Sequence, residues 1–343
     1  MSFDESGFLN INKVSKALSK RLPQYEGPWT VKKTAHGQSN PTFILNGPGK
    51  NLVVRCKPYG KLLKSAHMIE REYKVMSALS LANVPVPKMY YICENIEEIG
   101  TPYFVMEFID GNAFLRPDLP NLSSDERSLL YDQMNLGLAN LHKVEPNNIG
   151  LKDFGRSGNY FSRQLSIWGH QYQLSKTEDI SDVEILYDWL KNNLPSETEQ
   201  SRLVHGDWRI DNLLFGKEKP ILSAVLDWEI STIGDTRADL ANQLMQWSMP
   251  PGMEGRGLEG LDRTKLGIPS DNEYIEKYTE RVGRTSLPDL KFPIAFCFFR
   301  MSAILQGVKK RALDGNASNP EMAMKVGRMI PEYSKRAILH LEN

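Results

Sequence analysis

The chain has 343 residues, of which 41% are hydrophobic and 24% are charged, and its 42 basic and 42 acidic side chains leave a formal net charge of +0. These values are typical of a globular protein long enough for two domains. The charge balance excludes a general electrostatic attraction to nucleic acid or to an anionic membrane. The three cysteines are scattered, Met1–Asn10 shows no signal-peptide pattern, and the sequence has no apolar run of about 18 residues. We therefore expect a cytoplasmic protein.

The first third of the chain is predicted to be rich in strands. An amphipathic helix is expected over residues 9–22, and a second helix over residues 61–81. Alternating or apolar runs predict five strands around these helices, at residues 29–33, 42–45, 52–56, 90–93 and 103–109. This segment is therefore expected to form a sheet with a few helices against it.

The remainder of the chain is predicted to be mainly helical. Helical periodicity covers residues 124–142, 160–176, 181–192, 236–248, 271–283, 291–313 and 319–341. The Gly- and Pro-rich stretch 249–269 is expected to be a long surface loop. Because the strands come first and the helices follow, the order predicts an α+β protein with a β-rich lobe at 1–109 and a helical lobe at 110–343.

Three polar residues stand at the ends of apolar runs in the second half. Asp207 and Asn212 lie five positions apart in His205-Gly206-Asp207-Trp208-Arg209-Ile210-Asp211-Asn212, and Asp227 follows an apolar strand 20 residues after Asp207. Phosphoryl transfer from a nucleotide needs a carboxylate that accepts the acceptor hydroxyl proton, and an amide and a second carboxylate that bind Mg²⁺. We therefore expect Asp207 to be catalytic and Asn212 and Asp227 to be metal ligands.

The order and spacing resemble the kinase signature H-R-D-L-x-x-x-N followed by D-F-G, with Asp227-Trp228-Glu229 as the second motif. The chain resembles the aminoglycoside phosphotransferase and choline kinase-like family of small-molecule kinases, which implies a bilobal protein-kinase-like fold and the cofactors ATP and Mg²⁺. Arg209 occupies the place of a kinase lysine, and we expect it to neutralise charge on the transferred phosphoryl group. The segment Gly234–Ala241 resembles the family's G-D-x-x-x-D-L-A, in which Asp239 would brace the catalytic loop.

The same resemblance predicts the nucleotide site. The loop His36–Pro41 contains Gly37-Gln38-Ser39-Asn40, whose backbone N–H groups are expected to cover the phosphates. Leu52-Val53-Val54-Arg55 resembles the V-A-I-K strand, with Arg55 in place of the phosphate-pairing lysine and Lys57 as a competing candidate on the same strand face. Glu72 is expected to pair with Arg55. Backbone groups near Glu107 and Ile109 are expected to bind adenine.

The acceptor is predicted less directly. Gln164, Trp168 and Gln171 resemble the branch of the family found fused to, or beside, acyl-CoA dehydrogenases. That branch favours a small-molecule hydroxyl substrate such as a hydroxyacyl-CoA, while an aminoglycoside, sugar or amino-alcohol kinase stays open. A nucleotide-binding pseudokinase or regulatory module is the alternative from another class, favoured by the change of Lys to Arg55. A protein kinase is disfavoured because Gly206 replaces the Arg of H-R-D.

Overall fold

The computed structural model describes residues 9–34, 40–58, 68–196, 201–286, 288–317 and 319–342. The chain forms two compact units, one made of residues 1–111 and 223–229, the other of 112–222 and 230–343. A single boundary in the sequence cannot express this division, because the short segment Ser223–Glu229 belongs with the first unit. Among the described residues, no helix has both the length and the apolar character needed to cross a lipid bilayer.

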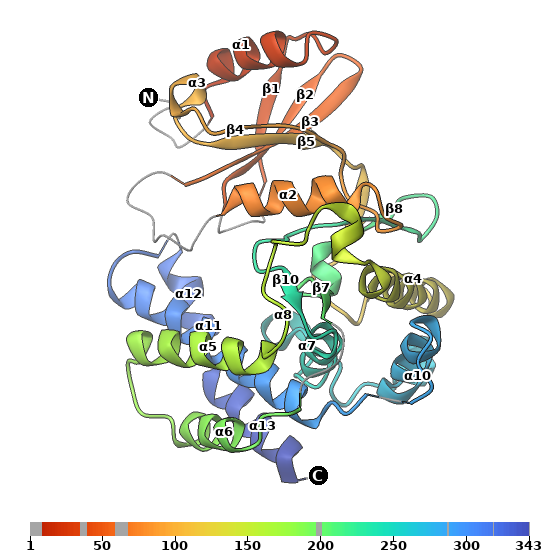
Figure 1. Ribbon diagram of the computed structural model, residues 1–343, viewed down its shortest axis with the longest axis vertical. Helices are drawn as coiled ribbons and strands as arrows, with labels where there is room; N and C mark the ends of the chain where they lie inside the picture. Colours follow the sequence, from red (N-terminus) through yellow and green to blue (C-terminus); the bar gives the residue numbers. More distant parts are fainter. Residues whose placement is uncertain are drawn as a thin grey trace. The chain divides into compact units, whose positions relative to one another are not determined.

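The first unit is built on a five-stranded antiparallel sheet with the order β1-β2-β3-β5-β4 (Figure 1). Its strands are β1 (Thr30–Lys33), β2 (Thr42–Gly47), β3 (Lys50–Cys56), β4 (Met89–Cys93) and β5 (Tyr103–Glu107), and its helices are α1 (Ile11–Arg21), α2 (Ile69–Leu79) and α3 (Ile96–Ile99). All five predicted strands are present. The predicted helix 61–81 begins at Ile69 in the described part of the chain, since residues 61–67 lie outside the described residues.

Side-chain alternation along β3 decides which residues face α1 and which face α2. Leu52, Val54 and Cys56 are fully buried in the hydrophobic core that α1 shares with the sheet. The helix α2 lies on the opposite face of the sheet, as Figure 1 shows, where its Tyr73 ring contacts Phe104 of β5. Because successive side chains in a strand point to opposite faces, Arg55 is directed to the α2 side.

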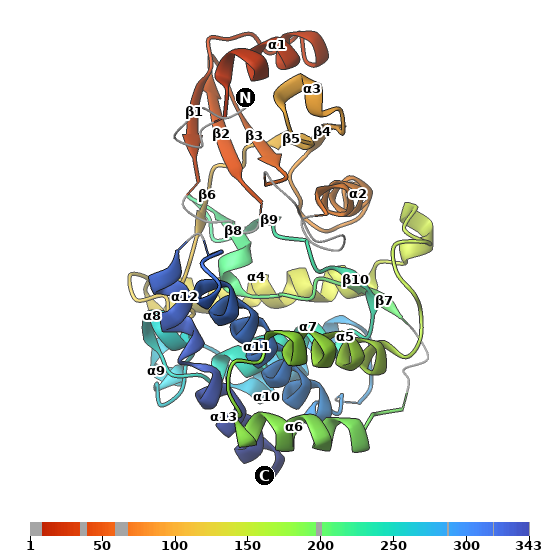
Figure 2. The ribbon, with the colours of Figure 1, turned by 90° about the vertical axis from the view of Figure 1, so that its left-hand side faces the viewer.

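The second unit is helical around a central helix, α11 (Lys291–Leu313) (Figure 2). Contacts with α11 are made by α5 (Tyr160–Ser175), α6 (Ser181–Asn192), α7 (Arg237–Trp247), α12 (Pro320–Gly327) and α13 (Ile330–Glu342). The remaining helices are α4 (Ser124–Lys143), α8 (Gly252–Gly255), α9 (Arg263–Leu266), α10 (Asp271–Arg281) and the 3₁₀ turns η1 (Pro146–Ile149) and η2 (Ile210–Asn212). The second unit also has the short strands β6 (Gly111–Ala113), β7 (Arg202–Val204), β8 (Leu213–Gly216) and β10 (Thr232–Gly234), whereas β9 (Leu222–Val225) lies mostly in the segment that belongs to the first unit. The strand-rich first unit and helix-rich second unit confirm the α+β class.

Two predictions for the second unit were wrong in detail. The helix expected over 319–341 is divided into α12 and α13, because Pro331 lacks the N–H that a continuous helix needs and instead occupies the first turn of α13. The stretch 249–269 is not a plain loop, because it contains the short helices α8 and α9. The apolar periodicity of 319–341 is too even to show the break between α12 and α13. The helices α8 and α9 are too short to produce a periodicity that could be recognised.

Candidate active site

In the first unit, Arg55 lies at the centre of a buried charge cluster. Its Nε is 3.0 Å from Oε2 of Glu72 on α2, and its Nη2 is 3.4 Å from Oδ1 of Asp227. Asn40 is fully buried and donates from Nδ2 to Oε1 of Glu72 over 2.9 Å. We call these four residues, Arg55, Glu72, Asn40 and Asp227, the Arg55 cluster. The expected pairing of Arg55 with Glu72 is therefore present.

The charges of the Arg55 cluster are unbalanced. Burial disfavours the charge of Arg55, but the carboxylates of Glu72 and Asp227 hold the pKa of its guanidinium above the ordinary value. Burial raises the pKa of Glu72 to about 7, since the loss of solvation outweighs the attraction of Arg55. A cation that bound near Asp227 would add the positive charge that this cluster lacks.

Lys57, the competing candidate, has a different partner. Its Nζ pairs with Oε1 of Glu70, which is partly exposed on α2. Arg55 is therefore the β3 cation that pairs with the buried carboxylate of Glu72. This geometry favours Arg55 over Lys57 as the residue that corresponds to the phosphate-pairing lysine.

Asp227 is held in an unusual backbone conformation. Its φ is +62°, a region that non-glycine residues rarely adopt and that is often associated with functional sites. The segment is attached to the first unit by a hydrogen bond from the N–H of Val225 to the carbonyl of Pro85, at 2.9 Å, and Trp228 is fully buried. The Asp227 side chain remains 42% exposed. It is thus fixed in place with a carboxylate open to a ligand.

The other predicted nucleotide contacts are described in part. Gly37, Gln38 and Ser39 lie outside the described residues. At the end of β5, the N–H of Glu107 donates to the carbonyl of Lys88 over 2.8 Å, and the Glu107 side chain accepts from Lys50. An adenine contact there would therefore use the carbonyl of Glu107 and the backbone of Ile109.

In the second unit, the loop that contains Asp207 and Asn212 is held by Asp239 of α7. Asp239 is fully buried, and its two carboxylate oxygens accept from the N–H groups of His205 and Gly206, each over 2.7 Å. His142 of α4 adds a third contact to the carboxylate, at 3.1 Å. The expected bracing role of Asp239 is confirmed by these contacts.

Gly206 is required by the shape of this loop. Its φ is +88°, and a Cβ at this position would lie 2.9 Å from the carbonyl oxygen of Ile230. A side chain would therefore be both strained and sterically blocked. His205 is buried, and its Nδ1 accepts from the N–H of Asp207 over 3.2 Å. It supports the backbone, as expected, and its ring contacts the buried Trp208.

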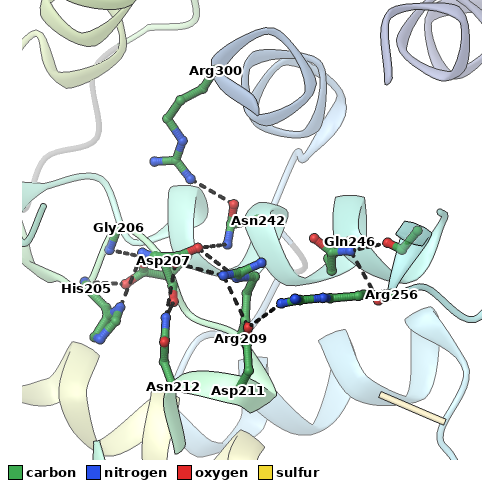
Figure 3. Close-up of polar contacts among 12 residues, drawn as sticks. His205, Gly206, Asp207, Arg209, Asp211, Asn212, Asn242, Gln246, Arg256 and Arg300 are labelled. Carbon is green, nitrogen blue, oxygen red and sulfur yellow. Dashed lines mark hydrogen bonds and ion pairs between the residues drawn. The ribbon is translucent and has the colours of Figure 1, made fainter. Parts of the chain in front are cut away.

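Figure 3 shows the polar contacts that meet at Asp207. Its Oδ2 accepts from Asn212 Nδ2 over 3.0 Å and from Arg209 Nη2 over 3.2 Å, and its Oδ1 lies 3.5 Å from Asn242 Nδ2. Asn242 in turn accepts from Arg300 Nη2 over 2.8 Å. We call Asp207, Arg209, Asn212, Asn242 and Arg300 the Asp207 cluster.

The Asp207 cluster keeps its central carboxylate ionised. Burial alone would raise the pKa of Asp207, but the positive charges of Arg209 and Arg300 outweigh it and hold the pKa below the ordinary value. An ionised carboxylate is the form that accepts a proton from a hydroxyl group. The cluster is therefore suited to a general base.

Asn212 is oriented by its amide nitrogen. The turn η2 brings it back towards Asp207, and its Nδ2 donates to both the carbonyl and the carboxylate of that residue, at 2.9 and 3.0 Å. In the described part of the chain, no hydrogen bond engages its amide oxygen. A neutral oxygen here, like the carboxylate of Asp227, is the type of donor that Mg²⁺ prefers.

A pocket of about 250 Å³ lies beside Arg209. Its apolar wall comes mainly from α8, α11 and α12 and the start of α13, and includes Met253, Met301, Leu305, Met322 and Met329. Its charged side chains are Arg209, Arg256, Lys325 and Glu254, of which the last two form an ion pair at 2.9 Å. Arg256 also pairs with Asp211 of the catalytic loop, at 3.1 Å. The pocket thus combines flexible apolar side chains with three cations that are each paired with a carboxylate.

Three of these residues were not predicted from the sequence: Asn242, Arg256 and Arg300. Arg256 lies in the stretch expected to be a loop, where no periodicity pointed to a role. Arg300 ends the apolar run Phe292–Phe299 on α11. An isolated charged residue beside such a run indicates a buried partner, and this is the sequence signal for Arg300.

A family described as "Phosphotransferase enzyme family" matches residues 30–262. Mouse acyl-CoA dehydrogenase family member 10 is 43% identical over 312 residues, which cover 91% of this chain and 29% of the mouse protein. Chicken acyl-CoA dehydrogenase family member 11 is 38% identical over 332 residues, which cover 95% of this chain and 42% of the chicken protein. The chain thus spans less than half the length of these two relatives.

Solved structures agree with these matches. A putative aminoglycoside phosphotransferase from Ralstonia eutropha is 40% identical, with a TM-score of 0.86 over 96% of this chain and 98% of that one. A ternary complex of a thermostable mutant of aminoglycoside phosphotransferase APH(4)-Ia with AMP-PNP and hygromycin B shares the fold, with a TM-score of 0.62 and 15% identity over 96% of this chain and 98% of that one. The kinase-like fold and the acyl-CoA dehydrogenase-associated branch are confirmed, and the chain belongs to the phosphotransferase enzyme family.

Proposed function

We propose that the protein is a small-molecule kinase that transfers the terminal phosphoryl group of ATP to a hydroxyl group. The observation that carries this proposal is the Asp207 cluster, in which a partly exposed carboxylate is kept ionised and is anchored through Asn212. A binding module would have no need of an ionised base that is held in place in this way. The pseudokinase alternative is therefore disfavoured.

The roles of the residues follow from their own surroundings. Asp207 accepts the hydroxyl proton of the acceptor, and Arg209 neutralises charge on the phosphoryl group as it is transferred. Arg55, which is oriented by Glu72, binds a phosphate of the nucleotide. We assign the adenine contact to the backbone at Glu107 and Ile109.

Asn212 and Asp227 are the proposed Mg²⁺ ligands. Their donor atoms fit, since one is an amide oxygen without a described partner and the other a carboxylate on a strained, exposed turn. When bound, Mg²⁺ supplies positive charge that offsets the phosphate oxygens during transfer. Asn212 has a second task, because its amide nitrogen also fixes the orientation of Asp207.

For the acceptor we propose a hydroxylated acyl compound, such as a hydroxyacyl-CoA. The methionine-lined pocket beside Arg209 suits a flexible apolar chain, and Arg256 and Lys325 suit an anionic group. The relatives named acyl-CoA dehydrogenase family members 10 and 11 support an acyl substrate. An aminoglycoside carries several positive charges, which the arginines of this pocket would repel.

The test is a phosphate-transfer screen with purified protein, Mg²⁺ and labelled ATP. The acceptors are hydroxyacyl-CoAs of several chain lengths, the matching acyl-CoAs without the hydroxyl group, aminoglycosides, sugars and choline. We expect label in a hydroxyacyl product and none in the matched compound without the hydroxyl. Transfer to aminoglycosides or choline alone would contradict the acyl proposal, and no transfer to any acceptor would contradict the kinase proposal.

A further inference from the structure

Arg300 is a buried arginine that reaches the Asp207 cluster from α11. It is 4% exposed, and its guanidinium lies 5.8 Å from the centroid of the Phe296 ring. Among the residues that the structure describes, its hydrogen bond goes to Oδ1 of Asn242, over 2.8 Å, and not to a carboxylate (Figure 3). Burying a cation without a direct ion pair is unfavourable. Such a residue needs an anion nearby to account for its burial.

Asn242 connects Arg300 to that anion. It is fully buried on α7, with its oxygen towards Arg300 and its Nδ2 3.5 Å from Oδ1 of Asp207. This amide orientation is dictated by its neighbours, because a guanidinium can only donate hydrogen bonds and an ionised carboxylate can only accept them. The donors therefore run in one direction, from Arg300 through Asn242 to Asp207.

Arg209 contacts the same carboxylate in a different manner. It lies on the catalytic loop, its side chain is 21% exposed, and its Nε is 2.9 Å from Oδ1 of Asp207 without hydrogen-bond geometry. An acceptor hydroxyl must reach an oxygen of Asp207, so one of the present contacts has to give way. The Arg209 side chain is partly exposed and can move, whereas Asn242 and Arg300 are buried on helices.

We propose that Asn242 and Arg300 are positioning residues, which hold the Asp207 carboxylate in place from α7 and α11 while Arg209 yields to the acceptor. This inference rests on the proposed function, in which Asp207 receives the acceptor hydroxyl. Neither residue touches the acceptor or the nucleotide. Their effect is therefore on kcat and not on the affinity for MgATP.

The first test compares variants of Arg300 in steady-state kinetics, with water and with the acceptor found by the screen. Arg300→Met should lower kcat by about 10- to 100-fold, the usual effect of losing a residue that orients a reactive group, and leave the KM for MgATP within about threefold. Arg300→Lys, which keeps the charge, should recover most of the loss. Arg311→Met is the matched control, because Arg311 lies exposed on the same helix.

A merely structural role would give a different pattern. If Arg300→Lys and Arg300→Met were equally impaired, or if KM for MgATP rose as much as kcat fell, the inference would be overturned. Asn242→Asp provides an independent and nearly isosteric variant, which removes the donor to Asp207 and places a carboxylate beside it. It should lower kcat at least as much as Arg300→Met, and an unchanged kcat would equally overturn the inference.

The second test does not depend on activity. The urea midpoints of Arg300→Met, Asp207→Asn and the double variant form a cycle that measures their coupling. Arg300→Met should lower the midpoint less when Asp207 is already neutral, because Asp239 is then the one remaining carboxylate that offsets the burial of Arg300 among the described residues. Equal losses in both backgrounds would overturn the inference. If the wild type turned over no MgATP at all, the proposed function would fail while this cycle still decided the coupling.

Discussion

The Arg55 cluster and the Asp207 cluster are both buried charge networks, but their charges are arranged in opposite ways. In the first, a single arginine meets the carboxylates of Glu72 and Asp227, and the pKa of Glu72 rises to about 7 because burial dominates. In the second, a single carboxylate lies in the field of Arg209 and Arg300, and its pKa falls although desolvation alone would raise it. The balance between burial and the neighbouring charges therefore sets the protonation of each site, and it falls on opposite sides in the two clusters.

This difference suggests a division of labour. A cluster with surplus negative charge is suited to receive a cation, which here would be the Mg²⁺ that accompanies ATP. A cluster with surplus positive charge keeps its own base ionised and is suited to meet phosphoryl oxygens. Because each cluster belongs to a different unit, each can be altered separately, and the following variants should affect them differently.

The largest effect is expected for Asp207→Asn. The amide is similar in size but cannot accept the acceptor proton, so kcat should fall by about 10²- to 10⁴-fold. The affinity for MgATP should stay within a few-fold, since Asp207 is assigned to the acceptor. Steady-state kinetics and calorimetry measure the two quantities. Near-normal turnover in a folded variant would show that the Asp207 cluster is not the catalytic one.

The next effect is expected for Arg55. Arg55→Ala should cost about 2–5 kcal/mol of transition-state stabilisation, because it leaves nucleotide phosphates and the buried Glu72 without a cation. Arg55→Lys should retain measurable activity, since it keeps a point charge. Lys57→Ala is the control, because Lys57 pairs with Glu70 instead. If Lys57→Ala lost activity and Arg55→Ala did not, the phosphate contact would have to be reassigned to Lys57.

Asp227→Ala should have a more selective effect. It should weaken MgATP binding by at least about 10- to 100-fold, while binding of ATP without Mg²⁺ should change little. Calorimetry with ATP in Mg²⁺ and in EDTA separates the two. Unchanged affinity at saturating Mg²⁺ would remove the proposed metal role and with it the reason for surplus negative charge in the Arg55 cluster.

The sequence predicted the two clusters to different extents. The catalytic loop could be recognised because Asp207, Asn212 and the bracing Asp239 lie close together in the chain and their spacing reflects a fixed turn. Arg55 and Glu72 could also be paired, since a strand and the following helix place them near each other. Asn242 and Arg300 escaped notice because their connection with Asp207 depends on how α7 and α11 pack. Such packing has no local sequence pattern.

The fold was predictable to a similar degree. Strands and long helices followed from periodicity, and their order indicated the two lobes. The break between α12 and α13 and the short helices α8 and α9 did not follow, because one proline or a single turn changes periodicity very little. The tripeptide Asp153-Phe154-Gly155 matches a kinase motif by letter but precedes the catalytic loop, and it lies in a turn after η1. The order of the motifs along the chain was thus more informative than the identity of these three residues.

The last prediction concerns the pH dependence of stability and not activity. Because the pKa of Glu72 is raised to about 7 in the folded protein, the folded state keeps a proton that the unfolded state releases near pH 4.5. The contribution of Glu72 to the free energy of unfolding is therefore fully present below about pH 4.5. It is lost as the pH rises through about 7, by up to about 3 kcal/mol. Glu72→Gln cannot ionise, so the stability of the variant relative to the wild type should increase between pH 5 and about 8.

Urea unfolding of the protein without nucleotide, followed at both pH values, measures this difference. Glu94→Gln is the matched control, because Glu94 is an exposed carboxylate in the same unit and should leave the pH profile parallel to that of the wild type. If Glu72→Gln also ran parallel to the wild type, then Arg55 would be holding Glu72 ionised throughout. In both clusters the neighbouring charges would then outweigh burial. The remaining difference between the clusters would be the second carboxylate of the Arg55 cluster, Asp227.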